Sequence, residues 1–96
     1  MSVFEHATID VTPGREDEFQ RAVSGVGHLF PEAGAHAWQL RRCIEEPSRF
    51  VLLVEWETVE AHTVEFRGSP LFAQWRGAVA EFFAGPPSVQ HYTVCP

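Results

Sequence analysis

The chain has 96 residues and a formal net charge of −6, and 45% of its residues are hydrophobic, with eight Phe and three Trp among them. This length fits one domain, residues 1–96, and the lack of a basic stripe argues against nucleic acid or an anionic membrane as a partner. No apolar run approaches the roughly 20 residues of a membrane span. The two cysteines, Cys43 and Cys95, have no CxxC spacing, which favours a reduced, cytoplasmic setting.

Hydrophobic periodicity predicts a strand, a helix and a hairpin in the first part of the chain. Residues 3–11 alternate with period two, and residues 15–28 carry an apolar stripe at helical spacing behind an acidic first turn. Residues 35–44 and 49–57 are predicted to be paired strands, because the turn Glu45-Glu46-Pro47-Ser48 separates two apolar runs. The second of these strands contains the continuous run FVLLV, which is typical of a strand buried on both faces.

The rest of the chain predicts a broken helix and a last strand. Residues 58–67 have helical character, with Thr58 as the expected N-cap. Gly68 then interrupts the helix, and Ser69 is expected to cap a second segment that begins at Pro70 and carries the strongest apolar stripe of the chain. Residues 88–95 alternate again and predict a final strand.

The order β-α-β-β-α-β predicts a ferredoxin-like α+β fold, a four-stranded antiparallel sheet with helices on one face. No further layer in the chain is available to cover the other face of this sheet. We therefore expect a homodimer whose sheets face each other and bury Phe50 and Leu52 or the residues that alternate with them.

Candidate functional residues cluster in the second half of the chain. Trp56 ends the third strand, His62 lies in the next helix, and Arg76 is a lone cation at the edge of the following apolar stripe. These three elements can converge on one cavity between helices and sheet. In the alternative interpretation, Arg76 is a surface side chain and Trp75 is an ordinary core residue.

The histidines give no clear metal site. His6 and His91 lie on the first and last strands, which are expected to be neighbours, and opposed histidines can bind a metal. No third ligand is evident on that face, so no metal is predicted.

Three motifs identify a family. They are W-x5-H (Trp56 and His62), F-R-G-S-P-L-F over 66–72 and F-F-A-G-P-P-x3-H-Y over 82–92. With these motifs and the T-P-G-R-E-D-E-F segment after the first strand, the chain resembles the antibiotic biosynthesis monooxygenase (ABM) domain family over essentially its whole length. The resemblance implies a dimeric α+β barrel with a cavity between sheet and helices in each subunit. It also implies cofactor-independent oxidation, as in the quinone-forming members.

The resemblance also implies roles for individual residues. The quinone-forming enzymes use a Trp that matches Trp56 and an Arg that matches Arg76, whereas their Tyr falls at His62. Their Asn, which anchors oxygen and substrate, falls at Leu52, so the chain departs from the family pattern there. In the haem-degrading branch the haem-ligating His falls at Arg76, and haem degradation is therefore not expected.

The implied activity is oxidation by O2 of an electron-rich aromatic, a phenol, anthrone or quinol, without cofactor or metal. His62 would take the substrate proton and Arg76 would stabilise the resulting anion. The expected substrate-binding residues are Leu52, Phe66, Phe72 and Trp75, with Trp56 as a further catalytic residue. Two other classes stay open, a non-catalytic small-molecule-binding or accessory protein and an O2-independent isomerase or cyclase. Oxygen consumption separates the expected monooxygenase from a binding protein. An increase in product mass by oxygen separates the monooxygenase from an isomerase.

Overall fold

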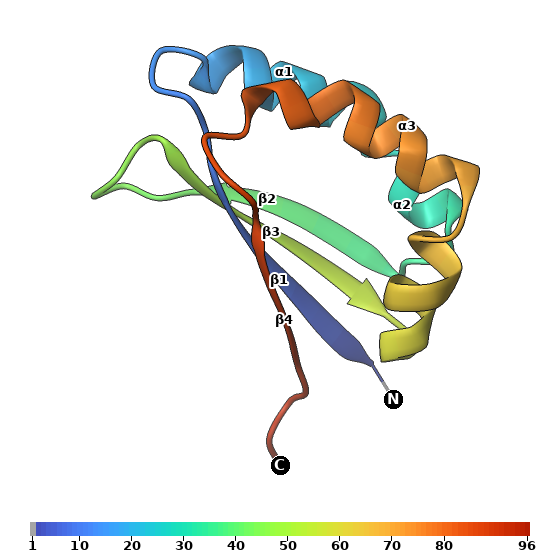
Figure 1. Ribbon diagram of the computed structural model, residues 1–96. Coiled ribbons are helices and arrows are strands. Elements are labelled where there is room, and N and C mark those ends of the chain that lie inside the picture. Colours follow the sequence, from blue (N-terminus) through green and yellow to red (C-terminus); the bar gives the residue numbers. More distant parts are fainter. Residues whose placement is uncertain (1) are drawn as a thin grey trace.

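The computed structural model, which describes residues 2–96, contains one antiparallel sheet with the strand order β2-β3-β1-β4 (Figure 1). The strands are β1 (Val3–Asp10), β2 (Ala37–Arg42), β3 (Arg49–Trp56) and β4 (Ser88–Tyr92). The predicted element order and the α+β class are confirmed. A single chain forms an open sheet rather than a closed barrel.

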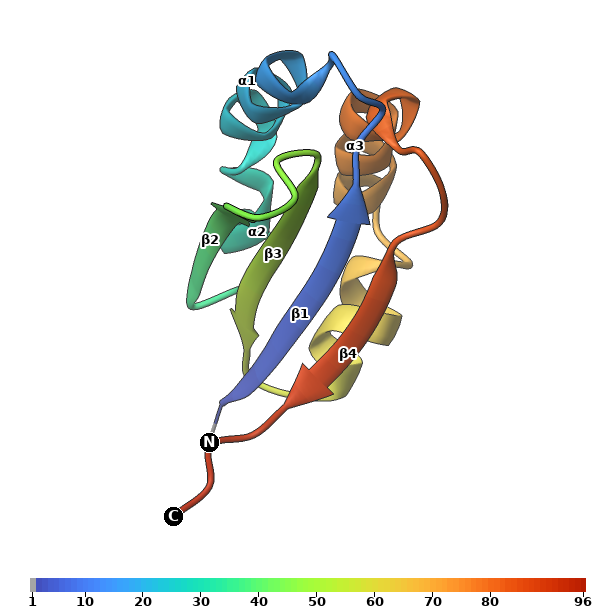
Figure 2. The ribbon, with the colours of Figure 1, turned by 90° about the vertical axis from the view of Figure 1, so that its left-hand side faces the viewer.

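The helical segments all lie on one face of the sheet (Figure 1). They are α1 (Glu16–Val26), α2 (Leu29–Glu32), the π-helix η1 (Ala61–Phe66), α3 (Pro70–Val79) and the 3-10 turn η2 (Ala80–Phe82). Figure 2 looks through the sheet and shows α1 and α2 behind β2 and β3, with α3 and η1 behind β1 and β4. Among residues 2–96, no helix has the length and apolar character needed to cross a membrane.

The strand register decides which side chains face the helices. On β3, Phe50, Leu52, Val54 and Trp56 point to the helices and are at most 2% exposed. The alternate residues, such as Val51 and Leu53, lie on the other face and are only partly buried. The FVLLV run is therefore fully buried on its helix face and half-buried on the outer face of a single chain.

The packing of α1 and α2 on β2 and β3, here called the closed half, is dense and aromatic. Phe19 of α1 meets Phe50 with ring centroids 4.9 Å apart and Phe82 at 6.2 Å, and all three rings are buried. Gly27, just after α1, lies against the Trp38 indole so closely that a Cβ atom would come within 2.0 Å of the ring. Full burial of each large apolar side chain contributes roughly 1.5–3 kcal/mol, so this half supplies much of the stability.

The predicted helix caps are partly right. Thr58 caps the segment that leads into η1, because its Oγ1 accepts a hydrogen bond from the Ala61 N–H at 3.0 Å. Ser69 occupies the N-cap position of α3, but its hydroxyl donates to the Phe66 carbonyl at 2.7 Å instead of capping the helix, so that prediction is wrong. Pro70 starts α3 as predicted.

Candidate functional site

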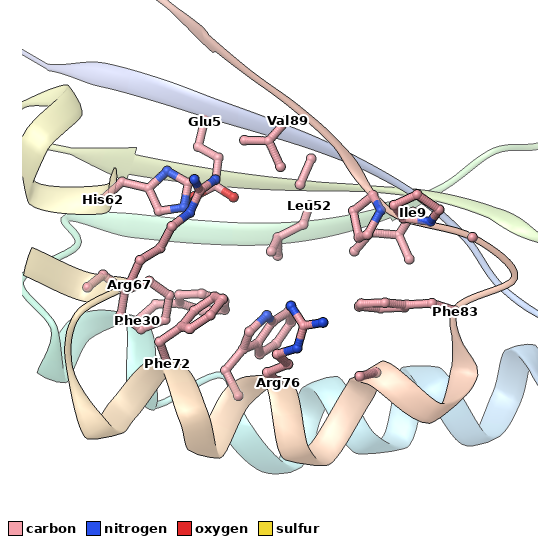
Figure 3. Close-up of a pocket in the computed structure, with 17 residues that line it drawn as sticks. Glu5, Ile9, Phe30, Leu52, His62, Arg67, Phe72, Arg76, Phe83 and Val89 are labelled. Atoms are coloured by element: carbon pink, nitrogen blue, oxygen red, sulfur yellow. The ribbon is translucent and has the colours of Figure 1, made fainter. Parts of the chain in front are cut away.

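A cavity of about 700 Å³ lies between α3 and the sheet (Figure 3). Its wall comes from β1, β3 and β4 on one side and from η1, α2, α3 and the segment 83–87 on the other. Most lining side chains are apolar, including Ala7, Ile9, Leu52, Phe66, Phe72, Trp75, Phe83 and Val89. We call the packing of α3 and η1 on β1 and β4, together with this cavity, the open half.

The structure brings most of the sequence-predicted site residues to this cavity. The residues that line it are Leu52, His62, Phe66, Phe72, Trp75 and Arg76. Trp56 is not among the lining residues, since it is completely buried. Its indole stacks on the His62 ring, with centroids 5.4 Å apart and planes 9° from parallel. Trp56 therefore packs against the His62 ring without reaching the cavity itself.

The sequence analysis missed Glu5, a carboxyl group that lines the cavity and is only 4% exposed. Its Oε1 accepts the Trp56 Nε1–H at 2.9 Å and lies 3.3 Å from His62 Nε2. Burial raises the pKa of Glu5 to about 7, although the Trp56 hydrogen bond and the Arg67 charge oppose the shift. The sequence pattern that could have identified Glu5 is the alternation of β1, which places it on the same core face as Ala7 and Ile9.

His62 has both of its ring nitrogens engaged. While Nε2 faces Glu5, Nδ1 is 2.8 Å from Nε2 of His91, which projects from β4 towards the helices. Burial, together with Arg67 and His91, lowers the pKa of His62 to about 4, and burial and Arg67 lower the pKa of His91 as well. His62 is therefore neutral near pH 7 and can donate from one nitrogen while it accepts at the other.

The π-helical turn of η1 positions His62. The His62 carbonyl accepts the Arg67 N–H at 3.1 Å, a bond that spans five residues. This wide turn places His62 and Phe66 on the same buried side, each 3% exposed, with ring centroids 6.2 Å apart.

Two guanidinium groups reach the same cavity. Arg67 follows η1 and Arg76 lies on α3, and both are exposed side chains that line the wall (Figure 3). Within residues 2–96, neither forms an ion pair. The open side of the cavity is therefore positive and favours an anion.

The predicted neighbourhood of His6 and His91 is only half right. β1 and β4 are paired, but His6 lies opposite Gln90 while His91 lies opposite Glu5. His6 thus faces away from the helices, where its ring packs against Tyr92 at 4.4 Å. The part of the chain that the structure describes contains no group of three His, Cys, Asp or Glu side chains that could hold a metal ion.

Known proteins share this fold and, in part, this sequence. Residues 2–78 match the family model described as antibiotic biosynthesis monooxygenase. A crystal structure from Bordetella bronchiseptica, assigned to the same group, is 45% identical, with a TM-score of 0.96 and coverage of 99% of this chain and 98% of that one. The uncharacterized protein YczJ of Bacillus subtilis is 35% identical over 91 residues, which are 94% of this chain and 96% of that protein.

A more distant structure has the same fold with a ligand bound. It is the monooxygenase from the gene ActVA-Orf6 of Streptomyces coelicolor in complex with nanaomycin D. It is 21% identical, with a TM-score of 0.82 and coverage of 99% of this chain and 88% of that one. At this level of identity the likeness concerns the fold alone.

Proposed function

The chain belongs to the antibiotic biosynthesis monooxygenase family, and we propose that it is a cofactor-independent monooxygenase that oxidises an electron-rich aromatic, a phenol, anthrone or quinol, with O2. One observation carries the proposal. An apolar cavity has a buried acid–base pair, Glu5 and His62, on its sheet side and the unpaired Arg76 on its helix side. A monooxygenase that uses no cofactor needs these groups to form and hold a substrate anion.

The cavity suits a small aromatic substrate. Its volume of about 700 Å³ lies within the range of about 300–1,000 Å³ that is usual for small-molecule sites. Phe66 and Phe72, whose rings meet edge to face at 5.5 Å, and Trp75 offer aromatic surface on the helix side. Leu52 and Ile9 give the opposite wall apolar surface, which suits an aromatic ring.

The proposed reaction begins with loss of a proton from the substrate to the buried Glu5–His62 pair. Arg76 stabilises the resulting oxyanion or carbanion, a contribution that is largest in a dry site. The anion transfers an electron to O2, and the two radicals combine to form a carbon–oxygen bond. The peroxide takes up a proton and loses water, which leaves a carbonyl group on the product. All the electrons that reduce O2 come from the substrate, so the balance needs no external reductant.

The proposal includes a homodimer formed through the outer face of the sheet. Val51 and Leu53 lie on this face, and no segment of the described chain covers them. A second sheet of the same kind would bury them. In sedimentation, Leu53→Glu should yield monomers, whereas Val64→Glu, at an exposed apolar residue of η1, should remain dimeric. A dimeric Leu53→Glu variant would contradict this arrangement.

The proposal also places the protein in the cytoplasm. Cys43 and Cys95 are both free thiols, and such thiols persist in a reducing compartment. Fractionation of the native host should find the protein in the cytoplasmic fraction.

Oxygen uptake tests the activity. Metal-free protein is offered a panel of anthrones, naphthols and quinols, with isotopically labelled O2 to trace oxygen in the product. We expect saturable uptake, one labelled oxygen atom in the product and a loss of about 10²–10³ in kcat for Arg76→Ala. Arg21→Ala, at an exposed position on α1, is the matched control and should retain full activity.

Two results would contradict the proposed activity. Tight aromatic binding without O2 uptake would identify a binding protein, and a rearranged product without labelled oxygen would identify an isomerase or cyclase.

A further inference from the structure

Building on the proposed function, we propose that Glu5 is the catalytic base of the cavity and that His62 and His91 form a relay that carries its proton to the solvent-exposed edge of the sheet at β4. The three side chains come from three different elements, β1, η1 and β4, and are joined by contacts of 3.3 and 2.8 Å.

The free oxygen of Glu5 identifies it as the base. His62 Nδ1 bonds to His91, and its Nε2 lies 3.3 Å from Glu5 Oε1, which also accepts the Trp56 Nε1–H. Glu5 Oε2 makes no hydrogen bond within residues 2–96. Every fully buried side-chain oxygen or nitrogen in these residues has a hydrogen-bond partner, so Oε2 is not fully buried. Oε2 is therefore open to a water-sized group, and Figure 3 shows the Glu5 side chain directed from the sheet into the cavity. It is the acceptor that a substrate would meet.

His91 supplies the exit of the relay. It belongs to β4, which is an edge strand, and it is half-buried without lining the cavity. Its Nε2 faces His62, and its Nδ1 has no hydrogen-bond partner in the described chain, so this nitrogen also reaches solvent. The relay thus connects the Glu5 side of the cavity with bulk water through two imidazole rings.

The proton balance closes over the reaction. The substrate gives its proton to Glu5, Glu5 passes a proton to His62 Nε2, His62 passes its Nδ1 proton to His91 Nε2, and His91 releases its Nδ1 proton to water. Moving the proton two residues away keeps it from returning to the substrate anion before O2 reacts. The reverse transfer then protonates the peroxide that loses water, and it restores both imidazoles to their first tautomers.

The charges around Glu5 suit this role. The titratable and charged groups that face it are His62 and Arg67 at η1, His91 on β4 and Arg76 on α3, whereas β3 faces it with Val54 and Trp56. The raised pKa of Glu5, about 7, is close to the value that suits a general base at neutral pH.

Kinetics of Glu5→Gln test the base. We expect kcat to fall about 10²–10⁴-fold, while the binding of 1,4-naphthoquinone, followed by tryptophan fluorescence, is retained. Glu65→Gln is the matched control, because Glu65 lies in η1 close to this region but is exposed and does not line the cavity. An unchanged kcat in folded Glu5→Gln would overturn the proposal.

Buffer rescue tests the relay. We expect His91→Ala to lose about tenfold in kcat, less than the loss of the base itself. Imidazole in the buffer should restore this rate, because the site of His91 is open to solvent, and should not affect the wild-type enzyme. His28→Ala, an exposed histidine between α1 and α2, is the control and should show neither loss nor rescue. A fully active His91→Ala variant would exclude the relay.

NMR titration tests the relay independently of activity, so the relay and the proposed function can fail separately. With carbon-labelled Glu and His, Glu5 Cδ should titrate near pH 7, and the His62 and His91 rings should show the same step. Glu5→Gln should abolish the shared step and leave the His6 signal unchanged. Titration of Glu5 in the ordinary carboxyl range, or a Glu5 step that His62 and His91 do not sense, would overturn the relay. An absence of O2 uptake across the panel would refute only the oxygenase.

Discussion

The closed and open halves of the molecule use the same sheet and the same layer of helices in opposite ways. In the closed half, Phe19 and Phe50 interlock with ring centroids 4.9 Å apart, and Phe19, Phe50 and Phe82 are all buried. In the open half, α3 lies over a cavity of about 700 Å³, and Glu5 and His62 are buried at its wall. Dense packing on one side supports incomplete packing and buried polar groups on the other.

The two halves show that a small domain can place the packing that stabilises it and the groups that carry its chemistry on different parts of one sheet. A buried carboxyl group and a cavity both cost stability. A chain of 96 residues has few apolar contacts to offset these costs. The following substitutions test whether the two halves are as separate as this comparison indicates.

The largest effect is expected at the centre of the closed half. Phe19→Ala should lower the free energy of unfolding by about 3–5 kcal/mol, because Phe19 is completely buried between Phe50 and Phe82. Phe72→Ala removes the same atoms from a half-buried ring that already faces the cavity, and should cost less than about 2 kcal/mol while weakening aromatic binding. Urea denaturation measures both values. Equal losses would show that the open half is packed as tightly as the closed one.

The next effect concerns the close approach of α1 to β2. Gly27→Ala should destabilise by about 1–3 kcal/mol, because its Cβ would overlap the Trp38 ring. Gly25→Ala is the matched control within α1, where a Cβ meets no atom within 4 Å, and should stabilise by up to about 1 kcal/mol. Thermal unfolding of the two variants checks the contrast. A stabilised Gly27→Ala variant would mean that Trp38 moves freely.

The pH dependence of stability should separate Glu5 from His62. Between pH 4.5 and 7 the native state keeps Glu5 protonated while the unfolded state ionises it, so the stabilising contribution of Glu5 falls as pH rises. His62 acts in the opposite direction, since its contribution is lost as pH falls from 6.5 to about 4.

In the wild type these two contributions oppose each other between pH 4.5 and 6.5. In Glu5→Gln only the His62 term remains, so its stability should rise with pH relative to the wild type. The relative slope should be at most ~1.4 kcal/mol per pH unit, reduced by solvent screening. Urea melts at successive pH values measure this difference, with Glu65→Gln as control. Parallel curves for Glu5→Gln and the wild type would contradict the raised pKa of Glu5.

The smallest effect is expected at the start of the η1 segment. Thr58→Ala removes the cap on the Ala61 N–H and should cost about 1 kcal/mol, mainly as faster hydrogen exchange in η1. Thr63→Ala is the control, because its hydroxyl only donates back to the Val59 carbonyl. Faster exchange in α1 of Thr58→Ala would show that the two halves open together.

Most of the fold could be predicted from local patterns. The alternation of apolar and polar residues in β1, the apolar run of β3 and the apolar stripe of α3 depend on residues close together in the chain, so the sequence alone predicts them. The cavity-lining positions Leu52, His62, Phe66, Phe72, Trp75 and Arg76 were found because the family resemblance assigned some of them and the α3 stripe assigned the others.

The rest of the site depends on contacts between distant segments. Glu5 interrupts an apolar alternation, and only the packing of η1 and β4 over it shows that it is buried. The placement of His6 and His91 required the register of β1 against β4, since a shift of one residue exchanges the two faces of a strand. The Ser69 hydroxyl donates to the Phe66 carbonyl because the last residue of η1 lies within hydrogen-bond distance of it.

The π-helical turn at Ala61–Phe66 has a consequence for how relatives of this chain are compared. Such a turn holds one residue more than the α-helical turn it replaces. A relative that lacks one residue here would align with this chain letter for letter on either side of the gap. The α-helical turn completes the same rotation with one residue fewer, so the later side chains of such a relative would keep their direction relative to His62. An alignment that leaves this gap out would instead pair each later residue with its neighbour, which on a helix points about 100° away.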